Sequence, residues 1–145
     1  MVSRTVRAIV SNPQDVEDVV QDTFVKALSA LTSYNADKAS FATWLSRIAY
    51  RTALNHRRDY KHHARVDDID VADSDGGRTA DAEALIRAID MLPAEDRAML
   101  NMYYYQDMRL SDISYITGCN VRTVATRLFR IRKRLAMIIK TLEKE

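Results

Sequence analysis

Residues 110–134 constrain the fold of this chain more than any other segment. Ile113 and Ile116 form one apolar edge, Gly118 provides the permissive backbone of a tight turn, and Asn120 is able to cap a following helix. After the turn, apolar residues recur at spacings of three and four, which places them on one stripe of a second helix. These residues are Val121, Val124, Leu128, Ile131 and Leu135. The pattern predicts two helices joined by a sharp turn.

The opposite face of the second helix is basic. It carries Arg122, Thr123, Thr126, Arg127, Arg130, Lys133 and Arg134. A helix with donors and hydroxyls on one side and an apolar stripe on the other fits the major groove of DNA. An ordinary amphipathic helix with a solvated charged face is the alternative. The preceding helix and turn favour DNA binding.

The N-terminal half also shows helical periodicity. Asn12-Pro13 is typical of a helix start. One apolar stripe then follows, made of Val16, Val19, Val20, Phe24, Ala27, Leu28 and Leu31. A loop at residues 32–40 separates it from a helix over residues 41–58. The buried side of that helix is predicted to be Phe41, Trp44, Leu45, Ile48, Ala49 and Thr52, and the exposed side Arg47, Arg51, Asn55 and Arg58.

Further helices are predicted after residue 80. Residues 81–91 would turn Leu85, Ile86 and Ile89 inward, and Pro93 would begin the next helix, with Met99, Leu100, Met102 and Tyr103 inside. The chain has only three glycines and two prolines in 145 residues, and no segment alternates as a strand does. We therefore predict an all-α fold.

Charge divides the chain into three parts. The net charge is only +2, yet basic blocks at residues 47–65 and 120–145 flank an acidic block at residues 66–83. The acidic block contains the Gly76-Gly77 pair and few large apolar residues, which favours a flexible linker. The prediction is two small helical domains, residues 1–65 and 81–145, joined by an acidic linker at residues 66–80. The two basic blocks indicate polyanion binding at two places.

Several function classes find no support in the sequence. There is no apolar run of membrane-spanning length and no signal peptide, so no membrane insertion is expected. A single cysteine, Cys119, can form no internal disulfide, which is consistent with a reducing cytoplasm. Its position at the helical turn favours a small buried thiol over a reactive one. His56, His62 and His63 lack a known metal-ligand spacing. We see no nucleophile, carboxylate pair or phosphate-binding loop, and predict neither a cofactor nor an enzyme.

Motifs in both halves resemble those of the extracytoplasmic-function (ECF) sigma factors, which belong to the sigma-70 family of bacterial RNA polymerase. The sequences DVEDVVQDTFVKA at residues 15–27 and FATWLSRIAYRTALNHRR at residues 41–58 resemble region 2. The sequences LPAEDR at residues 92–97 and RLFRIRKRL at residues 127–135 resemble region 4. The resemblance extends over residues 3–142. It implies a subunit without chemistry of its own that binds core RNA polymerase, recognises promoter DNA and directs transcription initiation.

The resemblance also implies roles for individual residues. Core polymerase would be bound by Asp18, Gln21 and Asp22. The single-stranded minus-ten element would be bound by Arg51 and Asn55 as base readers and by Arg47, Arg57, Arg58 and Lys61 as phosphate contacts. The duplex minus-thirty-five element would be bound by Thr126 and Arg130 as base or backbone readers, by Arg122 and Arg127 as phosphate contacts, and by Thr123. An anti-sigma factor is a further expected partner.

Three points stay open at this level. Trp44 is either a stacking platform for a base or a core residue, and its spacing of four from Ile48 favours the core; Tyr34 and Phe41 are candidate walls of a base pocket. The acidic linker either threads along the path of nascent RNA or acts as a plain tether. The alternative functions are a helix-turn-helix regulator and a sigma mimic that titrates an anti-sigma protein.

Two departures from the family pattern matter. Many relatives carry a basic residue at the position of Ala125 and a glycine at that of Arg122, so the promoter sequence read does not transfer. Family members also carry a further helix before the segment that matches residues 4–10. Here that helix is missing, which means either a fragment with a late start or a region 2 without one helix of its bundle, and the loss is expected to expose Val16, Val20 and Phe24.

Overall fold

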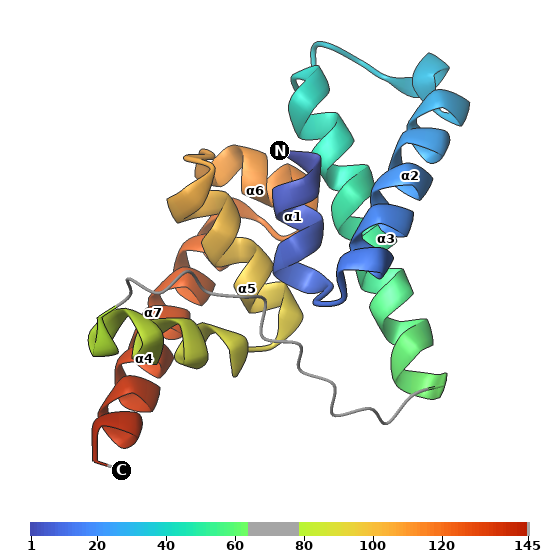
Figure 1. Ribbon diagram of the computed structural model, residues 1–145. Coiled ribbons are helices and arrows are strands. Elements are labelled where there is room, and N and C mark those ends of the chain that lie inside the picture. The colour runs from blue at the N-terminus through green and yellow to red at the C-terminus, as the bar shows by residue number, and fades with distance from the viewer. Residues whose placement is uncertain (64–78, 145) are drawn as a thin grey trace.

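A computed structural model describes residues 1–63 and 79–144 of the chain, and the backbone alone at residues 59–63. Within these ranges the chain is helical, and no strand is present (Figure 1). The elements are α1 (Val2–Ile9), α2 (Pro13–Ser29), η1 (Leu31–Ser33), α3 (Phe41–His63), α4 (Ala80–Asp90), α5 (Ala94–Leu100), η2 (Asn101–Tyr105), α6 (Leu110–Thr117) and α7 (Val121–Glu143). The all-α prediction is confirmed. Almost all of the predicted linker, residues 66–80, lies outside the described residues.

Local sequence signals place the helix starts in the N-terminal half. The Asn12 side chain accepts a hydrogen bond from the backbone N–H of Gln14 at 2.9 Å, and Pro13 occupies the first helical position. At the start of α3, the backbone N–H of Thr43 donates to the Ser40 hydroxyl at 3.2 Å. Helices α2 and α3 lie side by side with α1 packed against both (Figure 1).

The predicted helix-turn-helix is confirmed in α6 and α7. Gly118 ends α6 in the left-handed region with a φ of 79°, a conformation that a residue with a Cβ rarely adopts. The Asn120 side chain then caps α7 by accepting from the backbone N–H of Thr123 at 2.8 Å. The Ser114 hydroxyl closes the turn by donating to the Cys119 carbonyl at 2.5 Å. The angle between the two helices is therefore held by the turn itself.

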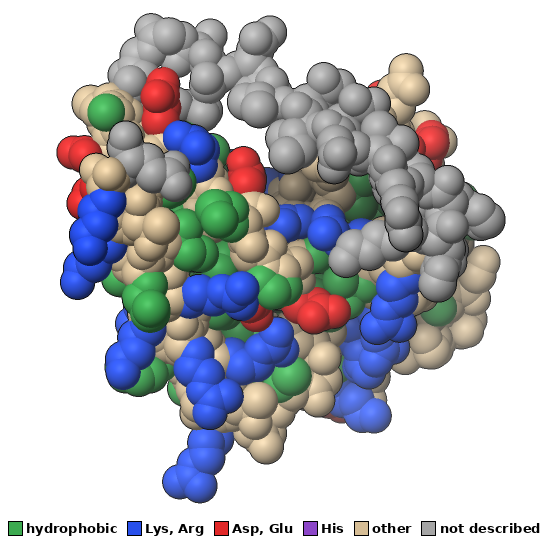
Figure 2. All heavy atoms as spheres, turned by 90° about the horizontal axis from the view of Figure 1, so that it is seen from below, with side chains coloured by type: hydrophobic (Ala, Val, Ile, Leu, Met, Phe, Trp, Pro, Cys, Tyr) green, Lys and Arg blue, Asp and Glu red, His purple; other side chains and the backbone are tan. Residues whose placement is uncertain are grey.

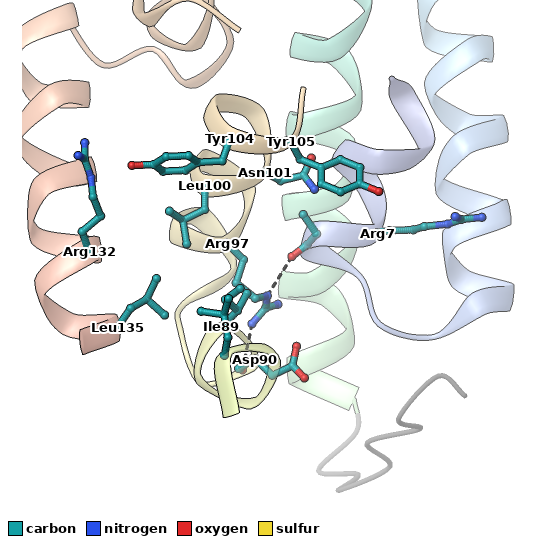
Figure 3. Close-up of a pocket in the computed structure, with 12 residues that line it drawn as sticks. Arg7, Ile89, Asp90, Arg97, Leu100, Asn101, Tyr104, Tyr105, Arg132 and Leu135 are labelled. Carbon is teal, nitrogen blue, oxygen red and sulfur yellow. Dashed lines mark hydrogen bonds between the residues drawn. The ribbon is translucent and has the colours of Figure 1, made fainter. Parts of the chain in front are cut away.

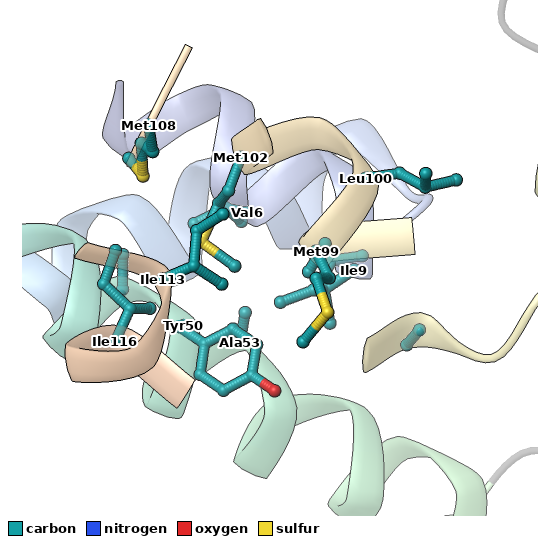
Figure 4. Packing of buried hydrophobic residues seen from close by; sticks show 14 of the residues in the cluster. Val6, Ile9, Tyr50, Ala53, Met99, Leu100, Met102, Met108, Ile113 and Ile116 are labelled. Atoms are coloured by element: carbon teal, nitrogen blue, oxygen red, sulfur yellow. The ribbon is translucent and has the colours of Figure 1, made fainter. Parts of the chain in front are cut away.

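The two halves share one hydrophobic core. Val6 and Ile9 of α1 and Tyr50 and Ala53 of α3 belong to the same buried cluster as residues of α5, η2 and α6 (Figure 4). The C-terminal members shown there are Met99, Leu100, Met102, Met108, Ile113 and Ile116. Helix α6 packs on α3, and α5 packs on α1. Residues on either side of the undescribed segment thus bury apolar surface against each other.

Polar contacts reinforce the contact between the halves. The Arg97 guanidinium of α5 donates to the carbonyl oxygens of Ala8 at 2.9 Å and Ile9 at 3.3 Å, and so satisfies the C-terminal end of α1. Burial, followed by the nearby Arg57 guanidinium, lowers the pKa of Arg97. The Gln106 amide donates to the Thr5 hydroxyl at 3.2 Å.

The structure corrects part of the predicted burial pattern. Of the apolar stripe on α2, Val16 and Ala27 are buried, but Phe24, Leu28 and Leu31 are exposed. Helices α1 and α3 cover only the side of α2 that carries Val16, Val19, Thr23 and Ala27. The prediction that Val16 is exposed is therefore wrong. Val20 is half-buried, so the prediction of its exposure is wrong in part. Phe24 is 48% exposed, as expected.

Three further burial predictions fail. Phe41 is exposed at the first position of α3, where the Tyr34 and Trp44 rings cover only part of it. Leu85 is exposed because α4 turns Ala88, not Leu85, fully inward. Val121, predicted to lie in the stripe of α7, is exposed in the first turn, whereas Val124, Leu128 and Ile131 are buried as predicted.

Candidate nucleic-acid and polymerase interfaces

Helix α7 presents a basic face to solvent. Arg122, Thr123, Thr126 and Arg130 are exposed, and the opposite stripe is buried against the other helices. The Thr126 hydroxyl donates to the Arg122 carbonyl at 3.0 Å, which leaves its oxygen lone pairs facing outward. Phe129 is 55% exposed, with the Lys133 ammonium 4.7 Å from its ring centroid. Helix α7 thus displays guanidinium, hydroxyl and aromatic groups on a rigid, capped support.

Arg127 lies differently from the other predicted contacts on α7. Its guanidinium donates to the Asp96 carboxylate at 3.0 Å and lies 3.8 Å from the Cys119 sulfur. Burial is the largest single influence and lowers the pKa of Arg127, but the hydrogen bonds to Asp96 and Cys119 and the charges of these two groups together outweigh it and raise the pKa above its ordinary value. Arg127 therefore joins α7 to α5 and to the turn.

Helix α3 carries the residues expected at the minus-ten element. Arg51, Asn55 and Arg58 are exposed, and Arg51 and Asn55 lie one helical turn apart. Arg47, predicted to be exposed, is half-buried because its guanidinium lies over the Tyr115 ring of α6, 4.7 Å from the centroid. Arg57 donates to the Ile9 carbonyl at 3.2 Å. The Lys61 side chain lies outside the described part of the chain.

An aromatic cluster stands at the start of α3. The rings of Tyr34 and Phe41 meet edge to face at 5.5 Å, and the Trp44 ring lies 5.3 Å from Tyr34. Trp44 is only 7% exposed, so the core interpretation of this residue is confirmed. Phe41 is exposed, and the Tyr34 hydroxyl donates to the Ala39 carbonyl at 3.1 Å. The exposed Phe41 ring therefore offers an aromatic surface next to the basic side of α3.

Helix α2 exposes the residues expected to bind polymerase. Asp18, Gln21 and Asp22 are all exposed, at helical positions that share one face. Val25 extends this face by one turn and is 61% exposed. The result is an acidic strip with an apolar end, directed away from α1 and α3.

A groove opens between α1, α4, η2 and α7 (Figure 3). Its volume is about 540 Å³, and Leu85, Ile89 and Leu100 form much of its apolar lining. Arg7 and Arg132 stand at opposite sides of the view, and Arg97 lies between them with its guanidinium turned toward the end of α1.

The surface in Figure 2 is rich in Lys and Arg, with apolar side chains between them and fewer acidic ones. Among the side chains that the structure describes, at residues 1–58 and 79–144, no cluster of His, Cys, Asp and Glu could hold a metal ion. No helix among those described is both long and apolar enough to cross a bilayer.

Family models identify the chain. The model of sigma-70 region 2 matches residues 1–63, and the model of sigma-70 region 4 matches residues 82–135. The chain belongs to the sigma-70 family. It is 31% identical to the RNA polymerase sigma-H factor of Pseudomonas aeruginosa over 94% of this chain and 79% of that protein. It is also 31% identical to the ECF RNA polymerase sigma-E factor of Escherichia coli K12, over 82% of this chain and 71% of that protein.

Solved structures share the fold. The sigma factor RpoE from Bartonella quintana, in complex with the anti-sigma factor NepR, superposes with a TM-score of 0.74 at 22% identity, covering 96% of this chain and 89% of that chain. CnrH, in complex with the cytosolic domain of CnrY, superposes with a TM-score of 0.67 at 25% identity, covering 97% and 80%. The resemblance of the sequence to an ECF sigma factor is therefore confirmed.

Sequence reasoning missed four residues that shape these surfaces. Asp96 and Tyr115 engage arginines that were assigned to DNA, Arg97 fastens α5 to α1, and Val25 extends the acidic face of α2. The helical register of α2 could have revealed Val25, seven residues after Asp18. The other three act across helices that are far apart in sequence, and no local pattern signals them.

Proposed function

We propose that this ECF sigma factor binds core RNA polymerase through the acidic face of α2, captures the melted minus-ten strand with α3, and reads the duplex minus-thirty-five element with α7. The exposed face of α7, on a helix fixed by the Gly118 turn and the Asn120 cap, carries the proposal. The chemistry of transcription belongs to the polymerase, and the chain acts where polymerase acts, in the bacterial cytoplasm.

The acidic face is proposed to orient the chain on a basic polymerase surface. Exposed carboxylates at Asp18 and Asp22 steer association and set its register, because opposite charges attract over distance. Asp22→Lys is expected to abolish binding to core polymerase in gel filtration while the helical circular dichroism spectrum stays unchanged. Asp37→Lys makes the same charge change at an exposed residue outside α2, and should bind as the wild type does. Equal binding by both variants would contradict the assignment.

The exposed side of α3 is proposed to hold unpaired bases. Single-strand capture needs cations along the phosphates and a π-face or polar group for a flipped base. Arg51 and Asn55 supply the polar groups, and the exposed edge of Phe41 supplies the π-face. Arg51→Ala should reduce promoter opening, detected as permanganate reactivity of unpaired thymines, and leave polymerase binding unchanged.

The two DNA contacts demand that the halves separate on polymerase. The minus-ten and minus-thirty-five elements lie roughly 25 base pairs apart, or about 85 Å along B-DNA. A compact chain of this length has a radius of gyration of about 15 Å. While α6 packs on α3, the chain can therefore contact either the minus-ten or the minus-thirty-five element, but not both. When both elements are bound, the halves are apart and part of the shared core is exposed.

An anti-sigma factor is the second proposed partner. In the two solved structures described above, the sigma factor RpoE is bound to the anti-sigma factor NepR, and CnrH is bound to the cytosolic domain of CnrY. A protein that stabilises the compact arrangement would oppose polymerase by mass action, since it favours the form that spans less DNA.

Reconstituted transcription tests the function as a whole. The chain is added to core polymerase on a genomic template, and the start sites are mapped. Initiation from a discrete set of promoters is the expected result. Polymerase binding without initiation would indicate a sigma mimic, and duplex binding without polymerase binding would indicate a plain regulator.

A further inference from the structure

On the basic face of α7, one arginine is turned toward the protein instead of solvent. Arg127 follows the exposed Thr126 directly, yet its side chain is only 30% exposed, and the Asp96 carboxylate that accepts its hydrogen bond is 17% exposed. Among the described residues, neither Arg122 nor Arg130 pairs with a carboxylate. The three arginines of this face are therefore not equivalent.

Three elements meet at the Arg127 guanidinium. Asp96 lies in the first turn of α5, Cys119 lies in the turn between α6 and α7, and Arg127 lies on α7 itself. Separate hydrogen bonds fix the turn, from the Ser114 hydroxyl to the Cys119 carbonyl and from the Thr123 amide to the Asn120 side chain. Of these three interactions, only the Asp96–Arg127 ion pair connects α7 to α5, and α7 packs against α5.

Tyr50 places the pair next to α3. Burial raises the pKa of Tyr50 to about 12, and the charges of Glu95, Arg127, Cys119 and Asp96 also act on its hydroxyl. The Asp96–Arg127 pair, which joins α5 to α7, thus lies near the Tyr50 hydroxyl of α3. If Arg127 turned out to a phosphate, it would leave a largely buried carboxylate without its cation, which is unfavourable.

We propose that Asp96 is a positioning residue for minus-thirty-five recognition that acts through Arg127, and that Arg127 sets the orientation of α7 instead of contacting a phosphate. The inference rests on the proposed function. It changes the role that the family resemblance gave to Arg127, and it leaves Arg122 as the phosphate contact and Arg130 and Thr126 as the readers of this face.

The test uses holoenzyme, made from the full chain and core polymerase, on a promoter from which the wild type initiates. The affinity for that promoter is measured from low to high salt for Asp96→Asn, Arg127→Gln and the double variant. Glu95→Gln is the matched control, because it removes one negative charge from the same turn of α5. Arg122→Ala is the reference for a phosphate contact. Thermal unfolding of each variant verifies that the fold is intact.

A positioning role predicts one pattern. Each single variant binds about five- to twenty-fold more weakly, and the double variant is no weaker than either single, because both lose the same interaction. The salt dependence keeps the wild-type slope in all three, whereas Arg122→Ala lowers the slope by about one. Glu95→Gln binds as the wild type does.

Two results would overturn the proposal. One is a slope lower by about one in Arg127→Gln, which marks a phosphate contact; the other is equal affinity of Asp96→Asn and Glu95→Gln. Should Asp96→Asn fail to fold, Asp96→Glu replaces it: weaker binding at an unchanged slope supports positioning, and wild-type affinity opposes it. Failure of the wild-type holoenzyme to initiate anywhere would contradict the proposed function and would be seen before any variant is compared.

Discussion

Helices α3 and α7 are both 23 residues long, both carry the arginines expected to touch DNA, and they are built into the molecule in different ways. Helix α3 is packed by α1, α2, α5 and α6, whereas α7 packs only one stripe against α4, α5 and α6. Two arginines of α3, Arg47 and Arg57, contact other parts of the protein. On α7, Arg127 pairs with Asp96 of α5, and Arg132 lies 5.7 Å from the ring centroid of Tyr104 in η2.

The difference shows how one residue type serves two purposes. On α7, recognition and packing lie on opposite faces, so that a DNA contact can be changed without disturbing the fold. On α3, the cations are divided between exposed positions and contacts with the neighbouring helices. Substitutions of Arg47 and Arg57 on α3 should therefore change stability and function together, and substitutions on the outer face of α7 should change function alone.

The largest expected contrast is between two aromatic residues. Trp44→Ala on α3 should lower the free energy of unfolding by about 3–5 kcal/mol, because a buried ring is replaced by a cavity. Phe129→Ala on α7 should change it by less than about 0.5 kcal/mol, since Phe129 is exposed. Urea denaturation followed by circular dichroism measures both. A large loss in Phe129→Ala would break the distinction between the helices.

The next effect concerns the contact between the halves. Arg97→Ala should cost about 2–3 kcal/mol of unfolding free energy, because the last carbonyls of α1 lose a charged donor. Arg87→Ala is the control, as Arg87 is exposed on α4. Hydrogen exchange should show the loss in α1 as well as in α5. Loss confined to α5 would mean that the halves do not fold as one unit.

Substitutions of Arg130 on α7 and Arg51 on α3 compare the DNA-binding roles of the two helices. Arg130→Ala should weaken binding to minus-thirty-five duplex by about 1–3 kcal/mol if it reads a base, with discrimination lost at one position of the element. Thermal stability should stay as in the wild type. An equal loss on every sequence would make Arg130 a phosphate contact instead. Arg51→Ala should leave duplex binding unchanged and impair only strand opening.

The smallest expected effect separates two arginines on α3 itself. Arg47→Ala should cost about 0.5–1 kcal/mol of stability, because its guanidinium lies over the Tyr115 ring. Arg51→Ala should cost nothing measurable in the same denaturation experiment, since Arg51 is exposed. Combining Arg47→Ala with Tyr115→Ala should add no further loss through the cation–π contact, and additive losses would argue against it.

Structural features that depend on neighbouring residues in the sequence could be predicted, whereas contacts between distant residues could not. The turn at Gly118, the cap at Asn120 and the burial of Val124, Leu128 and Ile131 on α7 follow from local rules, and the structure confirms them. The exposure of Leu28 and Leu31 was mispredicted because helical periodicity gives a stripe without saying how much of it a neighbour covers.

The engaged arginines were harder to foresee. Arg47, Arg97 and Arg127 are placed by partners on other helices, namely Tyr115, the end of α1 and Asp96. A sequence shows that a cation is present on a helix face, but a guanidinium on a long side chain reaches either solvent or a neighbouring element. The roles of Asp18, Arg51 and Arg130 in binding stay predictions until variants are measured.

The central claim is that one shared core holds the halves together in the free chain and that polymerase separates them. Fluorescence energy transfer tests it most directly, with labels at two exposed positions, Ser29 on α2 and Met137 on α7, in a Cys119→Ser background. The account predicts high transfer efficiency in the free chain and a clear fall when core polymerase is added. Efficiency that is equally high on polymerase, with promoter-specific initiation intact, would contradict it.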